Sequence, residues 1–148
     1  MSGIICAVRG GPDSQSTIDE AISLAIEVDL PLYFFFVVNL DFMSHTQTSK
    51  THTISDQLHQ MGEFILLTAQ ERAGARGVHA EALIRQGNVR EEIIKVAREL
   101  EADYFVLGLP VGEAEKNVFL SDRIREFGES IEQESGATVV LVGSAPKE

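Results

Sequence analysis

The sequence has no tryptophan and only one cysteine, Cys6, which excludes an internal disulfide. It also lacks a long apolar run, since Leu30–Val38 falls well short of the about 20 residues that a membrane span requires. Ile4–Val8 is too short for a signal peptide and leads at once into turn-forming residues. These absences predict a cytoplasmic protein without a membrane segment, in which Cys6 is a buried, unreactive thiol.

Basic residues are also scarce. The chain carries 12 Lys and Arg against 23 Asp and Glu, which gives a formal net charge of −11. A charge of this sign repels nucleic acid backbones and anionic lipid head groups. We therefore expect neither nucleic acid nor a membrane surface among the partners of this protein.

Five short apolar runs have the composition of β-strands. They are rich in β-branched or aromatic residues, and turn-forming residues follow most of them. The predicted strands are Ile4–Val8, Leu32–Val38, Val78–Ile84, Tyr104–Leu107 and Thr138–Val142. The third of these runs alternates in polarity, which indicates a strand at or near an edge of the sheet.

Four segments between these runs have the periodicity of helices, with apolar residues at three- and four-residue spacing. The predicted helices run from Ser14 or Ser16 to the stop at Asp29–Pro31, from Ser55 or Asp56 to about Ala75, over Val89–Leu100 with Asn88 as the cap, and over Val118–Glu134. The polar stretch Asn39–Asp56 has no apolar periodicity. We expect a long, flexible surface loop or lid there.

The alternation of strands and helices predicts the fold class. Helical connections of this length serve as crossovers between parallel strands, and right-handed crossovers place helices on both faces of the sheet. The 148 residues, 44% of them hydrophobic, are enough for one core. The predicted fold is an open, doubly wound α/β sheet in a single domain, residues 1–148.

In open α/β sheets, ligands bind beyond the carboxyl ends of the strands. Gly108–Gly112 leaves the carboxyl end of the fourth predicted strand, so we expect a ligand crevice just beyond Gly108. This glycine either lets a ligand approach the backbone or supplies a positive φ angle that the turn needs.

Four features of the sequence resemble the universal stress protein family when they are taken together and in order. They are Ile4–Val8 before a loop of small residues, Gln86-Gly87-Asn88 before a helix, Ala102–Gly108, and Glu129-Ser130-Ile131 leading through Gly136 into Thr138–Val142. The resemblance implies a five-stranded parallel sheet in the order 3-2-1-4-5. It also implies a homodimer through the edge strand Thr138–Val142, and an apolar edge strand does favour pairing with another chain.

Members of that family that bind ATP share the motif G-x2-G-x9-G-[S/T], whose glycines let backbone amides approach the phosphates. This chain resembles the motif only at its first position, Gly108. The second position is Val111, with Gly112 one residue late, and the final pair falls on Arg125 and Glu126. The ATP motif is therefore degenerate.

The resemblance also bears on the rest of the crevice. It implies that the walls of an adenine pocket persist at Ala7, Val8 and Val37, while the acidic residue that usually follows the first strand is replaced by Arg9. A cation at this place either holds an anionic ligand or forms an ion pair, with Asp13, Asp41 or Glu113 as the candidate partners. We favour the ion pair.

Three further cations, Lys116, Arg123 and Arg125, could replace the lost glycine contacts with charged ones. The helical spacing of Arg125 with Asp122, Glu126 and Glu129 instead favours a solvated face with local ion pairs.

The sequence offers little evidence for a metal site or a catalytic motif. His45, His52 and His59 are spaced by seven, but neither a cysteine nor a close histidine pair accompanies them, so we expect no metal site. The sequence contains no nucleophile elbow, Walker loop or dinucleotide-binding glycine motif.

Two functional interpretations remain. The first is a non-catalytic stress-response domain that acts through dimerisation or an unidentified small ligand, with no cofactor firmly implied. The alternative is a member that binds ATP or AMP through an altered phosphate loop at Gly108, Gly112 and Arg9.

Overall fold

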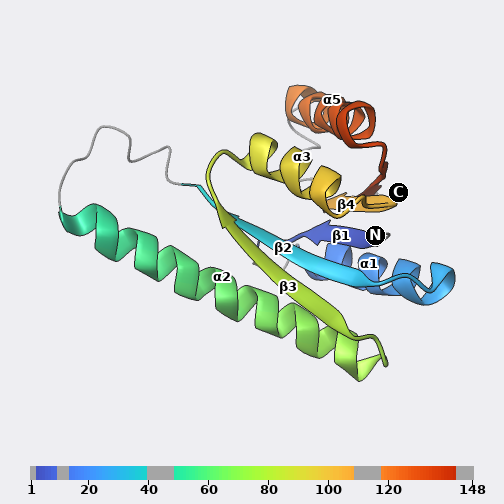
Figure 1. The fold of residues 1–148 in the computed structure, drawn as a ribbon, viewed down its shortest axis with the longest axis horizontal. Coiled ribbons are helices and arrows are strands. Elements are labelled where there is room, and N and C mark those ends of the chain that lie inside the picture. The colour runs from blue at the N-terminus through green and yellow to red at the C-terminus, as the bar shows by residue number, and fades with distance from the viewer. Residues whose placement is uncertain (1–2, 10–13, 40–48, 109–117, 143–148) are drawn as a thin grey trace.

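The structure is a computed structural model, which describes residues 3–9, 14–39, 49–108 and 118–142. Five parallel strands form one sheet in the order β3-β2-β1-β4-β5 (Figure 1). The strands are β1 (Ile4–Ala7), β2 (Leu32–Val38), β3 (Ala80–Gln86), β4 (Tyr104–Gly108) and β5 (Thr138–Val142). The predicted sheet and its strand order are confirmed.

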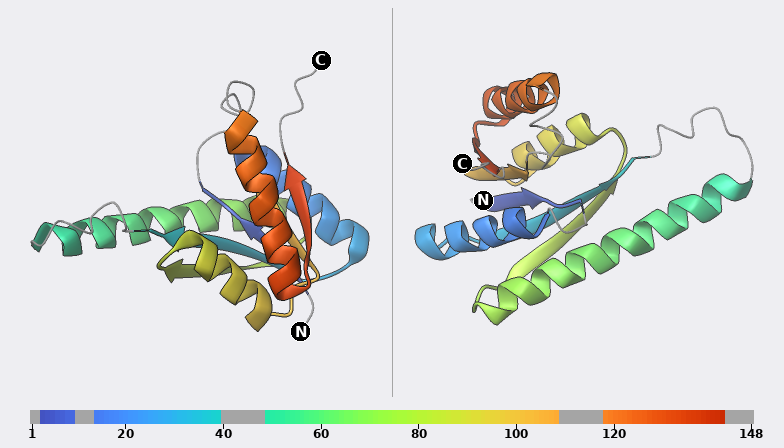
Figure 2. Two further views of the ribbon diagram at one scale, coloured as in Figure 1. Left: turned by 90° about the horizontal axis from the view of Figure 1, so that it is seen from above. Right: turned by 180° about the vertical axis from the view of Figure 1, so that it is seen from behind.

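Four helices cover the two faces of this sheet. They are α1 (Ser14–Val28), α2 (Ser49–Ala75), α3 (Val89–Glu99) and α5 (Val118–Ser135). Helices α1 and α2 lie on one face, and α3 and α5 lie on the other (Figures 1 and 2). The doubly wound arrangement is therefore confirmed. Within the described ranges, no helix combines the length and the hydrophobicity that a membrane-spanning segment needs.

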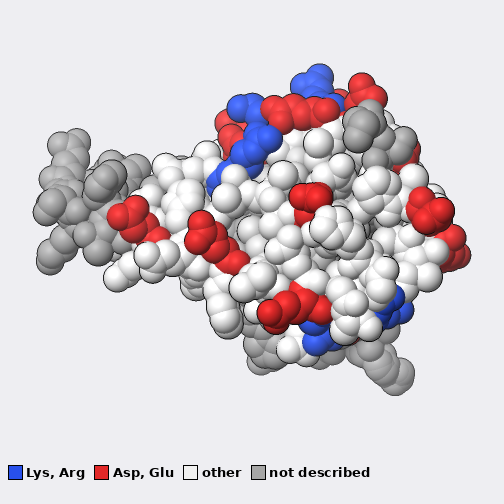
Figure 3. All heavy atoms as spheres, turned by 60° about the horizontal axis from the view of Figure 1, so that its bottom comes forward, with Lys and Arg blue, Asp and Glu red and all other residues white. Residues whose placement is uncertain are grey.

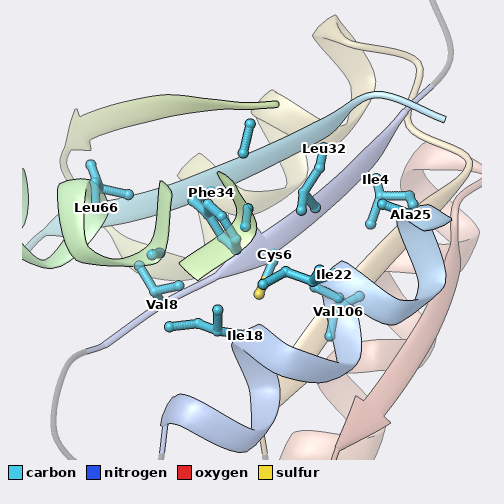
Figure 4. Packing of buried hydrophobic residues seen from close by; sticks show 14 of the residues in the cluster. Ile4, Cys6, Val8, Ile18, Ile22, Ala25, Leu32, Phe34, Leu66 and Val106 are labelled. Atoms are coloured by element: carbon cyan, nitrogen blue, oxygen red, sulfur yellow. The ribbon is translucent and has the colours of Figure 1, made fainter. Parts of the chain in front are cut away.

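The sheet separates two hydrophobic cores, because alternate residues of a strand point to opposite faces. Ile4, Cys6 and Phe34 pack against α1 and α2 (Figure 4). Ile5 and Phe35 belong to the core on the α3 and α5 side. Cys6 is buried, which confirms the prediction, and this burial raises the pKa of its thiol.

Helix α2 differs most from the prediction. It begins at Ser49, so part of the stretch that was predicted as a loop is helical, and residues 40–48 lie outside the described residues. Figure 1 shows that the first part of α2 extends past the ends of the strands. A helix that has no sheet to cover needs no apolar face, so this part of α2 has no apolar periodicity. The helix can extend into this part from the packed residues Leu66 and Ala69, because adding a turn to an existing helix is easier than starting one.

Strand β3 is an edge strand, as its alternating polarity predicted, but it begins two residues later than expected. Gly77 has a φ of +81°, and the Val78 N–H donates to the Ala73 carbonyl at 2.9 Å. These two features form the turn that ends α2. Val78 therefore belongs to the turn and not to the strand.

The ends of two helices follow the sequence signals. Asp29 has a φ of +58° and its N–H donates to the Ala25 carbonyl, which ends α1. The Asn88 Oδ1 accepts a hydrogen bond from the Glu91 N–H at 3.1 Å, which confirms Asn88 as the cap of α3.

Candidate functional site

A cavity of about 370 Å³ lies at the carboxyl ends of β1, β2 and β4, on the side of the sheet that α3 and α5 cover. Its lining comes from the strand ends and from these two helices. The lining residues are Ala7, Val8, Arg9, Phe35, Phe36, Val37, Val89, Ile93, Leu107, Gly108, Ile124 and Phe127. The cavity is where the sequence placed the ligand crevice.

The structure brings together five of the six predicted site residues. Ala7, Val8, Arg9, Val37 and Gly108 all line the cavity. The sixth, residue 112, lies outside the described residues. Whether these side chains bind a ligand remains a prediction.

The sequence did not identify the part of the wall that α5 contributes. Ile124 and Phe127 line the cavity from that helix. Both were visible as members of the apolar stripe of the last predicted helix. A stripe indicates which side of a helix is buried, but it does not show which of its residues border an empty space.

Among the described residues, the lining is mostly apolar and includes one charged side chain, Arg9, which is exposed. The Arg9 Nη2 lies 3.5 Å from the Gly108 carbonyl oxygen, which is long for a hydrogen bond. A contact of this length holds the guanidinium weakly, so it can turn to an anion at the mouth of the cavity. The three carboxylates predicted as ion-pair partners of Arg9 lie outside the described residues.

One wall of the cavity is held by an interaction between helices. The Arg90 guanidinium lies over the Phe127 ring, 4.5 Å from its centroid. A cation at this distance from a ring face is attracted to it. The contact ties α3 to α5 and fixes the Phe127 ring beside the cavity.

The structure bears on one of the two predicted roles of Gly108, the positive φ angle. Its φ is not positive, unlike those of Gly77, Gly87 and Gly136. A Cβ atom at position 108 would instead collide with the Oγ1 of Thr17, a buried residue of α1. The positive-φ interpretation is therefore wrong. The glycine is needed because β4 and α1 approach each other closely.

The two candidate cations that the structure describes do not line the cavity. Arg123 and Arg125 are exposed on α5 and do not belong to its lining, while residue 116 lies outside the described residues. His59 Nε2 lies 3.0 Å from Gln86 Oε1. Among the described residues, no group of three or more His, Cys, Asp or Glu is arranged to hold a metal ion.

Comparison with known proteins relates this chain to one family. The sequence model of the "Universal stress protein family" matches residues 1–122. Among curated proteins, none matches the chain.

Solved structures are similar over nearly the whole chain. The universal stress protein UspA from Lactobacillus plantarum is 16% identical with a TM-score of 0.74, and the match covers 95% of this chain and 97% of that one. A universal stress protein from Archaeoglobus fulgidus, solved in complex with dAMP, is 17% identical with a TM-score of 0.62, covering 96% and 98%. An AMP-bound family protein from Arabidopsis thaliana is 15% identical with a TM-score of 0.61, covering 99% and 94%. At these identities the likeness shows a shared fold.

Proposed function

Because this chain belongs to the universal stress protein family, we propose that it is a non-catalytic stress-response domain that binds a small ligand in the cavity beyond β1 and β4. The observation that supports the proposal is the apolar cavity with Arg9 as the one cation that its described residues place at the edge. Its volume lies within the range of small-molecule pockets, roughly 300–1,000 Å³. The ligand that fits this lining has a flat apolar ring and an anionic group that reaches Arg9.

The lining also supports a role without catalysis. Among the described residues, the side chains around the cavity include no nucleophile, no carboxylate and no histidine. Acid–base or nucleophilic catalysis needs at least one such group within reach of the substrate. This lining supports the proposal that the domain acts by binding.

Adenine nucleotides are the alternative ligands. The neighbours from Archaeoglobus fulgidus and Arabidopsis thaliana hold dAMP and AMP. An adenine ring matches the apolar walls, but the sequence places Val111, Arg125 and Glu126 where ATP-binding members have small residues. We propose that any adenine compound is held by its base and not by a polyphosphate chain.

Calorimetric titration with adenosine, AMP and ATP tests this proposal. We expect AMP to bind up to about fivefold more tightly than adenosine, because one exposed cation contributes at most about 1 kcal/mol. We expect no further gain with ATP. Binding of ATP at least a hundredfold more tightly than adenosine, or phosphate release by the clean protein with magnesium, would contradict the proposal.

Two arginine variants test whether Arg9 itself contributes to AMP binding. Arg9→Ala is expected to lower the AMP affinity by up to about fivefold and to leave adenosine binding unchanged. Arg125→Ala is the matched control, because it removes the same charge from an exposed position that does not line the cavity. Equal effects of the two substitutions would show that only the net charge matters.

We also propose a homodimer that forms through the edge strand Thr138–Val142. The Thr138 N–H donates to the Asp103 carbonyl before β4, so the Val139 N–H points to the open edge of the sheet. There the Glu132 carboxylate accepts it at 2.9 Å. This side chain protects the first part of the edge, and a second β5 strand must pair beyond Val139 or displace Glu132.

Sedimentation analysis of Glu132→Ala tests the dimer. Removal of the carboxylate leaves the Val139 N–H open to a partner strand, so the dissociation constant of the dimer should fall by about three- to tenfold, the value of one hydrogen bond. Glu129→Ala removes the same charge from an exposed position of the same helix. A wild-type protein that stays monomeric at this edge, or equal effects of the two variants, would contradict the proposal.

A further inference from the structure

Helix α2 exposes large apolar side chains on the side that faces away from the sheet. Met61, Phe64 and Leu67 are 46%, 70% and 53% exposed. On the opposite side of the helix, Leu66 and Ala69 are buried in the core. Three-residue spacing places the exposed side chains along one stripe. Burying that stripe requires a partner outside the described part of this chain.

The surface around the stripe is polar and includes an exposed carboxylate, Glu63, beside the stripe. Gln57, Gln60 and Thr68 share the outer side of α2 with Phe64, because they lie four or seven residues from it. Glu71 is the carboxylate at the end of this surface. Figure 3, which turns the lower side of Figure 1 forward, shows acidic side chains separated by uncharged surface. We use the name outer α2 surface for the exposed side of α2 that carries Gln57, Met61, Phe64, Leu67 and Glu71.

The outer α2 surface is symmetric about Phe64. Met61 and Leu67 lie three residues before and after it, and Gln57 and Glu71 lie seven residues before and after it. A two-fold axis at Phe64 would place two copies of this helix antiparallel. We propose that this surface binds the same surface of a second copy of the chain in that arrangement.

Each residue of the outer α2 surface then meets a suitable counterpart. Met61 packs on Leu67 of the second copy, and the two Phe64 rings meet at the axis. Glu71 faces Gln57 of the second copy, whose amide can donate a hydrogen bond to the carboxylate. A parallel arrangement would bring Glu71 against Glu71 and is disfavoured by like-charge repulsion.

Charge limits the strength of this association. The net charge of −11 opposes the approach of two copies. The exposed carboxylates of Glu63 and Glu71 add to this repulsion on the α2 side. Three exposed side chains form an interface below about 1,200 Å², so the association is reversible and depends on concentration.

This interface does not overlap the proposed β5 dimer. Helix α2 packs on β2 and β3, whereas β5 lies at the other edge of the sheet. Both interfaces can therefore be occupied in one assembly. Variants of α2 leave the β5 edge unchanged, so the two proposals fail or succeed independently.

Sedimentation velocity over a wide concentration range tests the outer α2 surface with Phe64→Glu. We expect this variant to raise the dissociation constant of one association step at least tenfold, because two carboxylates would meet at the axis. Ile26→Glu on α1 is the matched control, since Ile26 is 51% exposed and lies on another helix. Identical behaviour of the wild type and Phe64→Glu overturns the proposal, and so does an equal effect of Ile26→Glu.

A charge placed at position 57 tests the antiparallel direction. Gln57→Lys should strengthen the association by about three- to tenfold, because each new lysine faces Glu71 of the second copy. Gln57→Glu should weaken it by a similar factor. The residues three and four positions from 57 and from 71 within α2 are uncharged, so neither substitution forms a new ion pair along its own helix. Weaker association of Gln57→Lys, or no difference between the two variants, overturns the arrangement.

Discussion

Replacing Gly62 by alanine is expected to destabilise the protein by about 1–3 kcal/mol, although alanine is the better helix former. A Cβ atom at this position would lie 2.5 and 2.7 Å from the Cδ2 and Cε2 atoms of Phe36, and 3.0 Å from Ile84 Cδ1. Phe36 is a buried residue of β2, so its ring cannot simply turn into solvent. Helix α2 would have to move away from the sheet along its packed part.

Gly74→Ala is the matched control for this expectation. Gly74 belongs to the same helix, and a Cβ atom added there would meet no other atom within 4 Å. Alanine should therefore stabilise the protein at this position by about 0.5–1 kcal/mol. Urea denaturation of both variants measures the difference. Equal or increased stability of Gly62→Ala would contradict the contact between α2 and β2.

The shape of the Phe36 side chain gives a second test of this contact. The cost of Gly62→Ala should be smaller when Phe36 is already replaced by leucine, because two atoms of the ring cause the collision. A coupling of about 1 kcal/mol between the two substitutions is expected for residues in direct contact. Additive effects would place the cost of Gly62→Ala elsewhere.

Gly108→Ala is expected to reduce the free energy of unfolding by about 1–3 kcal/mol. The added methyl group would collide with the Thr17 hydroxyl group, and burial leaves Thr17 little room to move. Since the cause is the packing of β4 on α1, the loss should appear without any ligand. Thr17→Ala removes the colliding atom, so the cost of Gly108→Ala should be smaller in that background.

This substitution also separates packing from ligand contact. If Gly108 served only the close approach of a ligand, Gly108→Ala would weaken AMP binding and leave the urea midpoint unchanged. We expect a lower midpoint instead. A variant as stable as the wild type, with the same midpoint and slope, would contradict the role that we assign to Thr17.

The sequence predicts the continuous apolar strands of this fold better than it predicts where α2 and β3 begin. Leu32–Val38 and Thr138–Val142 were predicted with the bounds that the structure has, because continuous apolar runs mark strands clearly. The start of α2 was missed because its first turns extend past the sheet and need no apolar face. The predicted start of β3 was two residues too early because Val78 is apolar but belongs to a turn.

The candidate site was predicted in part for a similar reason. The carboxyl ends of parallel strands meet at one edge, so the convergence of Ala7, Arg9 and Gly108 follows from topology. The contribution of Phe127 depends on how α5 is rotated above the sheet. The apolar stripe of this helix indicates its buried side, but no local pattern shows which of the buried residues border the cavity. The sequence likewise gives no sign that Gly108 and Thr17 are in contact.

Phe36 belongs to two features of the molecule at once. Its ring lies beneath Gly62 of α2, and the same residue lines the cavity on the other side of the sheet. A ligand that shifts β2 at Phe36 would also shift the helix that packs on the Phe36 ring and carries the outer α2 surface. By thermodynamic linkage, any change in self-association on ligand binding must then be matched by an equal change in ligand affinity on self-association. One residue of β2 would thereby let the domain report the occupancy of its cavity.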